Sequence, residues 1–151
     1  MSTELELKFL LPCTELALLQ QLVAQTGMVV ERAEHALLNA YFDTSDNWFR
    51  RHDMGLRTRQ KQGRFEQTIK LAGQQHGAMQ MRPEYNLACD GVVPQLAAFP
   101  AHIWPPATDI AALQQQLTEL FRTDFVRSSW LLRCADNSEI ELAYDQGNII
   151  A

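Results

Sequence analysis

The chain has 151 residues, enough for one domain that buries a hydrophobic core. Hydrophobic residues make up 46% and charged residues 21% of it, as in ordinary globular proteins, and no apolar run approaches the roughly 20 residues of a membrane-spanning helix. The formal net charge of −5 argues against a nucleic-acid-binding or anionic-membrane surface, although a basic pocket for a small polyanion is compatible with it.

The N-terminus and the cysteines predict a cytoplasmic protein. The sequence Met1-Ser2-Thr3-Glu4 has neither the basic start nor the apolar stretch of a secretory signal. The three cysteines are widely spaced and form no Cys-x-x-Cys pair, which favours reduced thiols over a disulfide framework or a zinc site. They are Cys13, Cys89 and Cys134.

The first part of the chain predicts a strand followed by a helix. Residues 3–10 alternate between polar and apolar side chains, as in a strand with one packed face. The following helix would begin near Thr14 and stop at Gly27, and its apolar stripe would pack on the apolar face of the strand. That face consists of Leu5, Leu7 and Phe9.

The rest of the chain predicts mainly antiparallel strands. Strands are expected over residues 35–43, 55–60, 64–71, 79–88, 124–134 and 138–145. A proline-rich segment at 91–108 would cross the outside of the domain, and Asp109 would cap a helix over 110–121. This pattern predicts an α+β fold in a single domain that covers residues 1–151.

One face of the successive strands carries charges of both signs. Two interpretations are open: a solvated sheet face, where the charges contribute little, or the lumen of a closed barrel, where a ligand, ions and the charges themselves must satisfy one another. On the parity assigned above, this face includes Glu4, Glu6, Lys8, Tyr41, Asp43, Arg57, Arg59, Glu66, Thr68, Lys70, Arg82, Glu84, Arg127, Glu141 and Asp145.

A lumen with both signs of charge would suit a phosphate chain that binds together with metal ions. Guanidinium groups bind phosphate oxygens in a bidentate manner, and carboxylates bind Mg²⁺ or Mn²⁺, hard cations that prefer oxygen ligands. The expected phosphate-binding residues are Lys8, Arg57, Arg59, Lys70, Arg82 and Arg127. The expected metal ligands are Glu4, Glu6, Glu141 and Asp145.

Five short motifs occur in a specific order along the chain. They are Glu4-Leu5-Glu6-Leu7-Lys8, Tyr41-Phe42-Asp43-Thr44, Leu56-Arg57-Thr58-Arg59, Thr68-Ile69-Lys70 and Arg82-Pro83-Glu84. Each motif is weak alone, but the ordered set resembles the CYTH domain, the triphosphate tunnel metalloenzyme family. The resemblance runs from residue 3 to the end of the chain and is greatest to bacterial inorganic triphosphatases.

The resemblance implies an antiparallel β-tunnel, a CYTH-like barrel with polar faces inward and helices packed outside. It implies metal-dependent hydrolysis of inorganic triphosphate or another small polyphosphate compound, in which water attacks a terminal phosphorus. The catalytic residues implied are Lys8, Glu4 and Glu6. Lys8 would orient the water or stabilise charge, and the basic residues named above would grip the phosphates.

One difference from the family concerns the C-terminal part of the sequence. Members of the family continue beyond the turn that Asp145-Gln146-Gly147 resembles, into strands that carry a second set of alternating glutamates, whereas this sequence stops at Ala151. Two interpretations are open: the chain is a truncated fragment of a longer protein, which we favour, or its tunnel is open and another chain completes it by pairing with the sheet edge. We also expect weak or absent turnover even where phosphate binding is retained.

Other functions remain open at this point. A class IV adenylyl cyclase or a thiamine triphosphatase of the same family would use the same phosphate grip, and a non-catalytic polyphosphate-binding module would lack turnover. Phosphate release from tripolyphosphate but not from ATP favours the triphosphatase, whereas formation of cyclic AMP contradicts it. Nucleic-acid and membrane partners are not expected.

Overall fold

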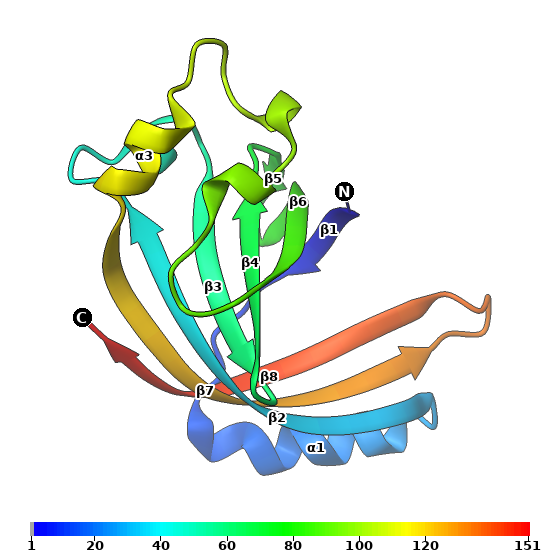
Figure 1. Cartoon of the computed structure of the whole chain (residues 1–151). Coiled ribbons are helices and arrows are strands. Elements are labelled where there is room, and N and C mark those ends of the chain that lie inside the picture. Colours follow the sequence, from blue (N-terminus) through cyan, green and yellow to red (C-terminus); the bar gives the residue numbers. More distant parts are fainter. Residues whose placement is uncertain (1) are drawn as a thin grey trace.

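A single curled sheet dominates the computed structural model, which describes residues 2–151 apart from the side chains of Ser2, Cys13 and Gln75 (Figure 1). The strands are β1 (Ser2–Leu7), β2 (Val29–Asp43), β3 (Gly55–Lys61), β4 (Arg64–Lys70), β5 (Gln74–His76), β6 (Met79–Cys89), β7 (Thr118–Arg133) and β8 (Glu139–Ile150). The α-helices are α1 (Leu16–Gln25), α2 (Trp48–Arg51) and α3 (Ile110–Gln116), and the 3-10 helices are η1 (Cys13–Glu15), η2 (Leu96–Ala98) and η3 (Ala101–Ile103).

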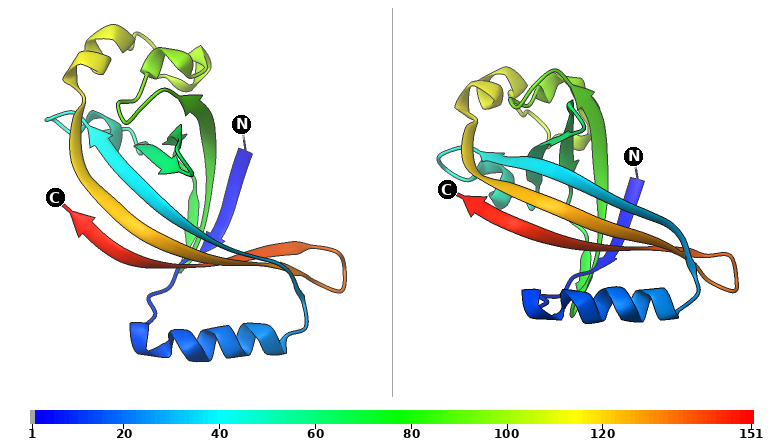
Figure 2. Two further views of the ribbon diagram at one scale, coloured as in Figure 1. Left: turned by 60° about the horizontal axis from the view of Figure 1, so that its bottom comes forward. Right: turned by 90° about the horizontal axis from the view of Figure 1, so that it is seen from below.

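All strand pairs are antiparallel, which confirms the predicted α+β fold. The order across the sheet is β1-β6-β4-β3-β2-β7-β8, and the short β5 also pairs with β6. Within the described part of the chain, β1 and β8 lie at opposite edges and do not pair with each other, so the sheet forms an open, curled half-barrel (Figure 2). None of the helices in residues 2–151 has both the length and the apolar character needed to span a bilayer.

The hydrophobic core lies on one face of this sheet, beneath the segment that connects β6 to β7. Phe42, Leu56 and Ile69 point to this face from neighbouring strands because they pair across the sheet in register. The connecting segment supplies side chains that cover them, and burial of this apolar surface stabilises the fold. The connecting segment contributes Leu96, Phe99 and Leu113 to the core.

The helix α3 is shorter than the sequence predicts, because it stops at Gln116 instead of continuing to 121. Asp109 caps it as expected, and its Oδ1 accepts a hydrogen bond of 3.1 Å from the backbone N–H of Ala112. Leu117 then takes an extended conformation, and β7 begins at Thr118 opposite Asp43 of β2. Strand pairing therefore overrides the helical pattern of the leucines at this point.

The predicted packing of α1 on the first strand is wrong. Strand β1 ends at Leu7, and Leu5, Leu7 and Phe9 are 63%, 63% and 76% exposed. The helix buries only Val23, and its C-terminal end is joined to β7 where the backbone N–H of Arg133 donates to the carbonyl of Met28. The helix itself runs beneath β2 (Figure 1).

The predicted turn at Asp145-Gln146-Gly147 lies inside a strand, because β8 runs without interruption to Ile150. Gly147 pairs with Phe125 and approaches the neighbouring backbone closely. A Cβ atom at this position would lie 1.9 Å from the carbonyl oxygen of Asp124, so only glycine allows the strand to pass here. The glycine thus permits close pairing of β7 and β8.

Candidate functional site

The registers of the strands place the predicted site residues on one face of the sheet. Directly paired residues share a face, and so do residues two apart in one strand. Directly paired residues on this face can be followed from β1 to β8. They are Glu4 with Arg82, Glu84 with Lys70, Thr68 with Arg57, Asn39 with Thr123, and Arg127 with Asp145. Further members, at the same parity, are Glu6, Tyr41, Arg59, Glu66 and Glu141.

This charged face is the inner face of the curl. Five strand spacings separate β1 from β7, roughly 24 Å in a flat sheet at about 4.8 Å each. The charge of Glu4 on β1 nevertheless contributes to the raised pKa of Arg127 on β7, after the larger effect of its hydrogen bond to Asp145. The charge of Glu4 is the last and smallest of these causes. The charged face lies opposite the hydrophobic core on a sheet that curls (Figure 2), and this arrangement favours the interpretation of a lumen.

Lys70 connects the first two carboxylates of this lumen. Its Nζ lies 2.6 Å from Oε2 of Glu4 and 3.9 Å from Oε2 of Glu84. Burial raises the pKa of Glu4, but the hydrogen bond and the charge of Lys70 outweigh burial, and the pKa lies below its ordinary value. Glu4 is therefore a carboxylate near neutral pH, and its charge is partly balanced by the lysine.

Arg127 and Asp145 form the second ion pair of the lumen. The Nε and Nη2 of Arg127 donate hydrogen bonds of 2.7 and 2.8 Å to the two carboxylate oxygens of Asp145. This bidentate geometry is the strongest arrangement of an arginine and a carboxylate. A predicted phosphate-binding residue is thus paired with a predicted metal ligand.

Arg57 and Arg59 are different, because neither forms an ion pair within residues 2–151. The Nε of Arg57 is buried and has no hydrogen-bond partner among the described residues, while its Nη2 donates to Oγ1 of Thr68 over 3.3 Å. Burial, followed by the charges of Arg57 and Arg127, lowers the pKa of Arg59 to about 10. Both guanidinium groups are charged at neutral pH and have donors that an anion could use.

Neutral polar side chains hold these two arginines, and the sequence interpretation did not assign roles to them. The Nε of Arg59 donates a 2.7 Å hydrogen bond to Oδ1 of Asn39, whose Nδ2 donates to Oγ1 of Thr123 over 3.0 Å. Asn39 and Thr123 share the parity of Tyr41 and Arg127, so the alternation already indicated their face. The signal in the sequence was an asparagine in the middle of a predicted strand, because such a polar side chain needs hydrogen-bond partners once it is buried.

Two predicted members of the lumen have other surroundings. Lys8 lies beyond the end of β1, its side chain is 75% exposed, and its Nζ is 3.8 Å from Glu6. Arg82 donates to the backbone carbonyls of Leu71 and Asp53, so its guanidinium fastens the ends of neighbouring segments. These two residues are therefore at the margin of the cationic group that Arg57 and Arg59 form.

Asp43 serves the fold at the end of β2. Its Oδ1 accepts from the backbone N–H groups of Thr44 and Phe49, and its Oδ2 accepts from Arg50. The side chain is buried and closes the turn that leads into α2. The register shift between Tyr41 and Phe42 precedes it. Its carboxylate is thus occupied by backbone donors, and it is a structural residue.

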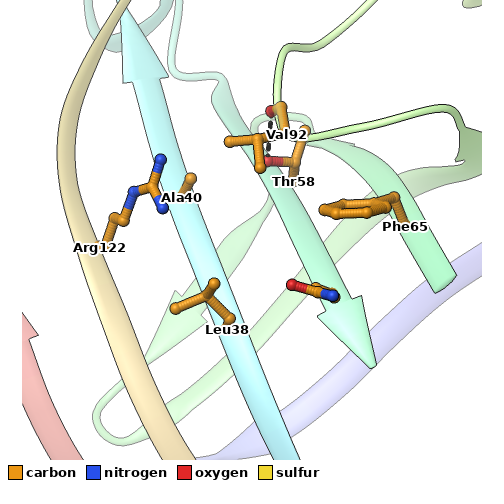
Figure 3. A pocket seen from close by; sticks show the side chains of 7 residues that line it. Leu38, Ala40, Thr58, Phe65, Val92 and Arg122 are labelled. Atoms are coloured by element: carbon orange, nitrogen blue, oxygen red, sulfur yellow. Dashed lines mark hydrogen bonds between the residues drawn. The ribbon is translucent and has the colours of Figure 1, made fainter. Parts of the chain in front are cut away.

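The outer face offers no comparable chemistry at the cavity shown in Figure 3. This void of about 10 Å³ is large enough for roughly one water molecule. Leu38, Ala40 and Phe65 line it, and Thr58 donates a 2.7 Å hydrogen bond to the carbonyl of Val92 beside it. Arg122 reaches this face, which makes it a useful contrast to the arginines of the lumen.

The carboxylates of the lumen fit a divalent cation in type and number of ligands. Mg²⁺ is commonly held by one or two carboxylates together with substrate phosphates and water. Glu4 and Glu6 are neighbours on the inner face of β1, and Glu141 shares the inner face of β8 with Asp145, four residues further along the strand. No three His, Cys, Asp or Glu side chains in the described part of the chain gather closely enough to form a complete metal cage by themselves.

An open antiparallel half-barrel with a lumen of arginines, lysine and carboxylates defines a CYTH-type tunnel domain. The CYTH domain family matches residues 2–150, and the chain belongs to this family. The match covers all strands and the complete set of inner-face residues, which confirms the resemblance of the five motifs.

Two known proteins illustrate the relationship. The chain is 34% identical over 157 aligned positions to the inorganic triphosphatase of Haemophilus influenzae, and the match covers 100% of this chain. The chain spans 42% of the length of that relative. Among solved structures, HpAC1 from Hippeastrum, assigned as an adenylyl cyclase with a dominant triphosphatase activity, matches with a TM-score of 0.57 at 15% identity over 94% of this chain and 70% of its own. The second likeness establishes the fold alone.

Proposed function

We propose that the inner face of this sheet binds inorganic triphosphate, together with Mg²⁺ or Mn²⁺, and hydrolyses it. The observation that carries the proposal is the pair of arginines, Arg57 and Arg59, that are partly buried without carboxylate partners. An uncompensated positive charge is costly inside a protein unless an anion balances it. The Haemophilus relative, named an inorganic triphosphatase, supports the choice of anion.

The cations would divide the work of holding the phosphate chain. Arg57 and Arg59 on β3 would bind phosphate oxygens at the centre, and Lys70 would approach from β4. Arg127 would contribute from the opposite wall once its pairing with Asp145 is loosened. Arg82, bound to backbone carbonyls, would contribute mainly by its charge. The result is a chain of phosphates fixed along one line of the lumen.

Glu4 and Glu6 would hold the divalent cation, with Glu141 and Asp145 on the facing wall. A divalent metal ion supplies charge neutralisation and lowers the pKa of bound water. The protein residues would orient the terminal phosphoryl group for attack by water, which breaks one phosphoanhydride bond and yields diphosphate and orthophosphate. Lys8, at the exposed mouth beside Glu6, would orient the water or stabilise the developing charge.

Binding and turnover are tested separately. Calorimetry with tripolyphosphate, with and without Mg²⁺, measures binding, and release of orthophosphate from tripolyphosphate and from ATP measures hydrolysis. We expect binding that Mg²⁺ strengthens, weak release of orthophosphate from tripolyphosphate, and none from ATP. Formation of cyclic AMP from ATP would instead identify a cyclase, and absence of tripolyphosphate binding would contradict the proposal.

A second candidate function is polyphosphate binding without turnover. In that case the arginines would still bind tripolyphosphate, while orthophosphate release would stay at the background rate. Thiamine triphosphate serves as a further substrate in the same assay. Faster release from it than from tripolyphosphate would indicate a thiamine triphosphatase.

Location and self-association also belong to the proposal. A cytoplasmic location is proposed from the sequence, since free thiols are typical of that reducing compartment. Cys89 and Cys134 are free, and the Cys13 side chain lies outside the described residues. The edge strands β1 and β8 each have one paired side, and Ile149 and Ile150 are exposed beside the second edge. Such edges favour pairing with another strand. Sedimentation across a range of concentrations measures whether the chain associates with itself.

A further inference from the structure

A neutral amide, and not a carboxylate, holds Arg59. The Nε of Arg59 on β3 donates to Oδ1 of Asn39 on β2, and Nδ2 of Asn39 donates to Oγ1 of Thr123 on β7. The two distances are 2.7 and 3.0 Å, and the three residues lie side by side on three neighbouring strands. Asn39 is 1% and Thr123 4% exposed, so this chain of hydrogen bonds is shielded from water.

The direction of the amide is fixed by its two neighbours. If the amide of Asn39 were turned around, its N–H₂ group would face the Nε–H of Arg59, and two donors would oppose each other. The donor Nε–H of Arg59 selects the orientation with the carbonyl oxygen toward it, and Thr123 then accepts the amide donor on the other side, so both ends of the amide have a partner. An unpaired donor at such a buried position is costly, so the arrangement has one stable orientation.

The neutral acceptor leaves Arg59 without an ion pair among the described residues, and the opposing carboxylate that acts on it from a neighbouring strand is that of Glu66 on β4. A carboxylate at the same place would form an ion pair like that of Arg127 with Asp145 and would compete with any incoming anion. The amide instead occupies only Nε, and the terminal nitrogens of the guanidinium keep their donors. No hydrogen bond or ion pair to these terminal nitrogens is found among the described residues.

We infer that Asn39, oriented by Thr123, is a positioning residue that holds Arg59 charged and directed at the phosphate chain. The inference rests on the proposed binding of tripolyphosphate. It states that Asn39 contributes to the affinity of that site although it touches no phosphate. It follows that adding one negative charge at residue 39 would harm binding far more than the same change elsewhere on the chain.

The decisive comparison is between Asn39→Asp and Asn137→Asp. Both add one carboxylate, but Asn137 lies in the exposed turn between β7 and β8. Calorimetry with tripolyphosphate in Mg²⁺-free buffer should show that Asn39→Asp weakens binding by at least about tenfold, whereas Asn137→Asp changes it by less than about twofold. Equal affinities of folded Asn39→Asp and wild type would overturn the inference.

A second pair of variants tests the role of orientation. Thr123→Ser keeps the accepting hydroxyl and should retain wild-type affinity, whereas Thr123→Val removes it and should weaken binding several-fold. This pair also keeps the inference testable if Asn39→Asp does not fold. Equal binding by both variants would show that Thr123 does not position the amide.

A ligand-free measurement separates this inference from the proposed function. The arginine Nε–H resonance of Arg59 in a ¹⁵N NMR spectrum should exchange slowly with water in the wild type and in Thr123→Ser. It should exchange faster in Thr123→Val and in Asn39→Leu, which remove the oriented acceptor. If wild type fails to bind tripolyphosphate, the proposed function fails, while the exchange rates still decide whether Asn39 holds Arg59. An unchanged exchange rate of the Arg59 Nε–H in Asn39→Leu would show that Asn39 does not hold Arg59.

Discussion

Arg127 and Asp145 face each other across β7 and β8 and are joined by two hydrogen bonds of 2.7 and 2.8 Å. The arginine is a candidate phosphate-binding residue and the aspartate a candidate metal ligand. When neither ligand is bound, each side chain is therefore held in an ion pair by the other. Binding of a cation by Asp145 would release Arg127 for a phosphate, so the two ligands should favour each other.

Replacing Asp145 by Asn separates these two roles. The variant removes the carboxylate that neutralises Arg127, so we expect metal-free affinity for tripolyphosphate to rise about threefold. It also removes a metal ligand, so the gain in affinity on adding Mg²⁺ should shrink. Calorimetry with and without Mg²⁺ measures both effects. The control is Glu139→Gln, which breaks the exposed ion pair with Arg133 in the same hairpin and should change neither affinity.

Removing the central arginines tests the phosphate grip directly. Arg57→Gln combined with Arg59→Gln should reduce tripolyphosphate affinity by at least about 100-fold, because two charge-assisted contacts are lost together. Arg122→Gln provides the matched control, since this arginine pairs with Glu119 and reaches the outer face (Figure 3). Equal loss in the control would indicate a nonspecific charge effect, and unchanged binding in the double variant would restore the interpretation of a merely solvated face.

The pairing of Glu4 with Lys70 predicts a pH dependence of stability. Because the pKa of Glu4 in the folded protein is lowered from 4.5, its contribution to stability is present above that value and is lost as pH falls through the folded pKa. Glu4→Gln should therefore lower the free energy of unfolding at neutral pH by at most about 1 kcal/mol, since the pair is partly exposed.

Urea unfolding of Glu4→Gln and wild type at pH 7 and at pH 3 measures this difference. The two proteins should become more nearly equal in stability as the pH falls, because the charge that pairs with Lys70 is lost as the carboxyl of Glu4 becomes protonated. Glu34→Gln is the control, because Glu34 is exposed and should give no pH-dependent difference. A difference between Glu4→Gln and wild type that grows toward acid pH would contradict the lowered pKa.

Asp43→Asn should destabilise the protein by about 2–3 kcal/mol, as measured by urea unfolding. The carboxylate accepts three backbone N–H groups through both oxygens, and an amide N–H₂ would oppose at least one of them. Asp109→Asn is the matched control: Asp109 caps α3 through a single accepted bond, which asparagine supplies equally well. Similar losses in both variants would mean that Asp43 acts only as an ordinary cap.

The alternation of side chains was sufficient to predict the inner face, because a strand has a period of two residues. It correctly placed Arg57 and Arg59 on the same face as Lys70 and Glu4. The partners within the face were not predictable, since parity does not specify the position of a residue along the tunnel axis. Nothing in the sequence could therefore show that Arg127 is paired with Asp145 while Arg59 is bound by an amide.

Local patterns also failed where long-range pairing competes with them. The leucines after Gln116 fit a helix, but pairing of Thr118 with Asp43 places them in β7. Asp43 matched the parity of the lumen, yet its carboxylate satisfies backbone donors at the start of α2. Gly147 read as a turn residue because glycine is common in turns, whereas here it allows two strands to approach closely.

Because β1 and β8 are not paired with each other in the described part of the chain, the distance across the lumen can change as the sheet bends. Glu4 and Asp145 stand on walls that no backbone hydrogen bond joins within residues 2–151, so only the bending stiffness of the intervening strands sets their separation. A phosphate chain and a cation that contact both walls would link them and reduce this bending. Ligand binding should therefore slow hydrogen exchange even in strands that contribute no side chain to the site.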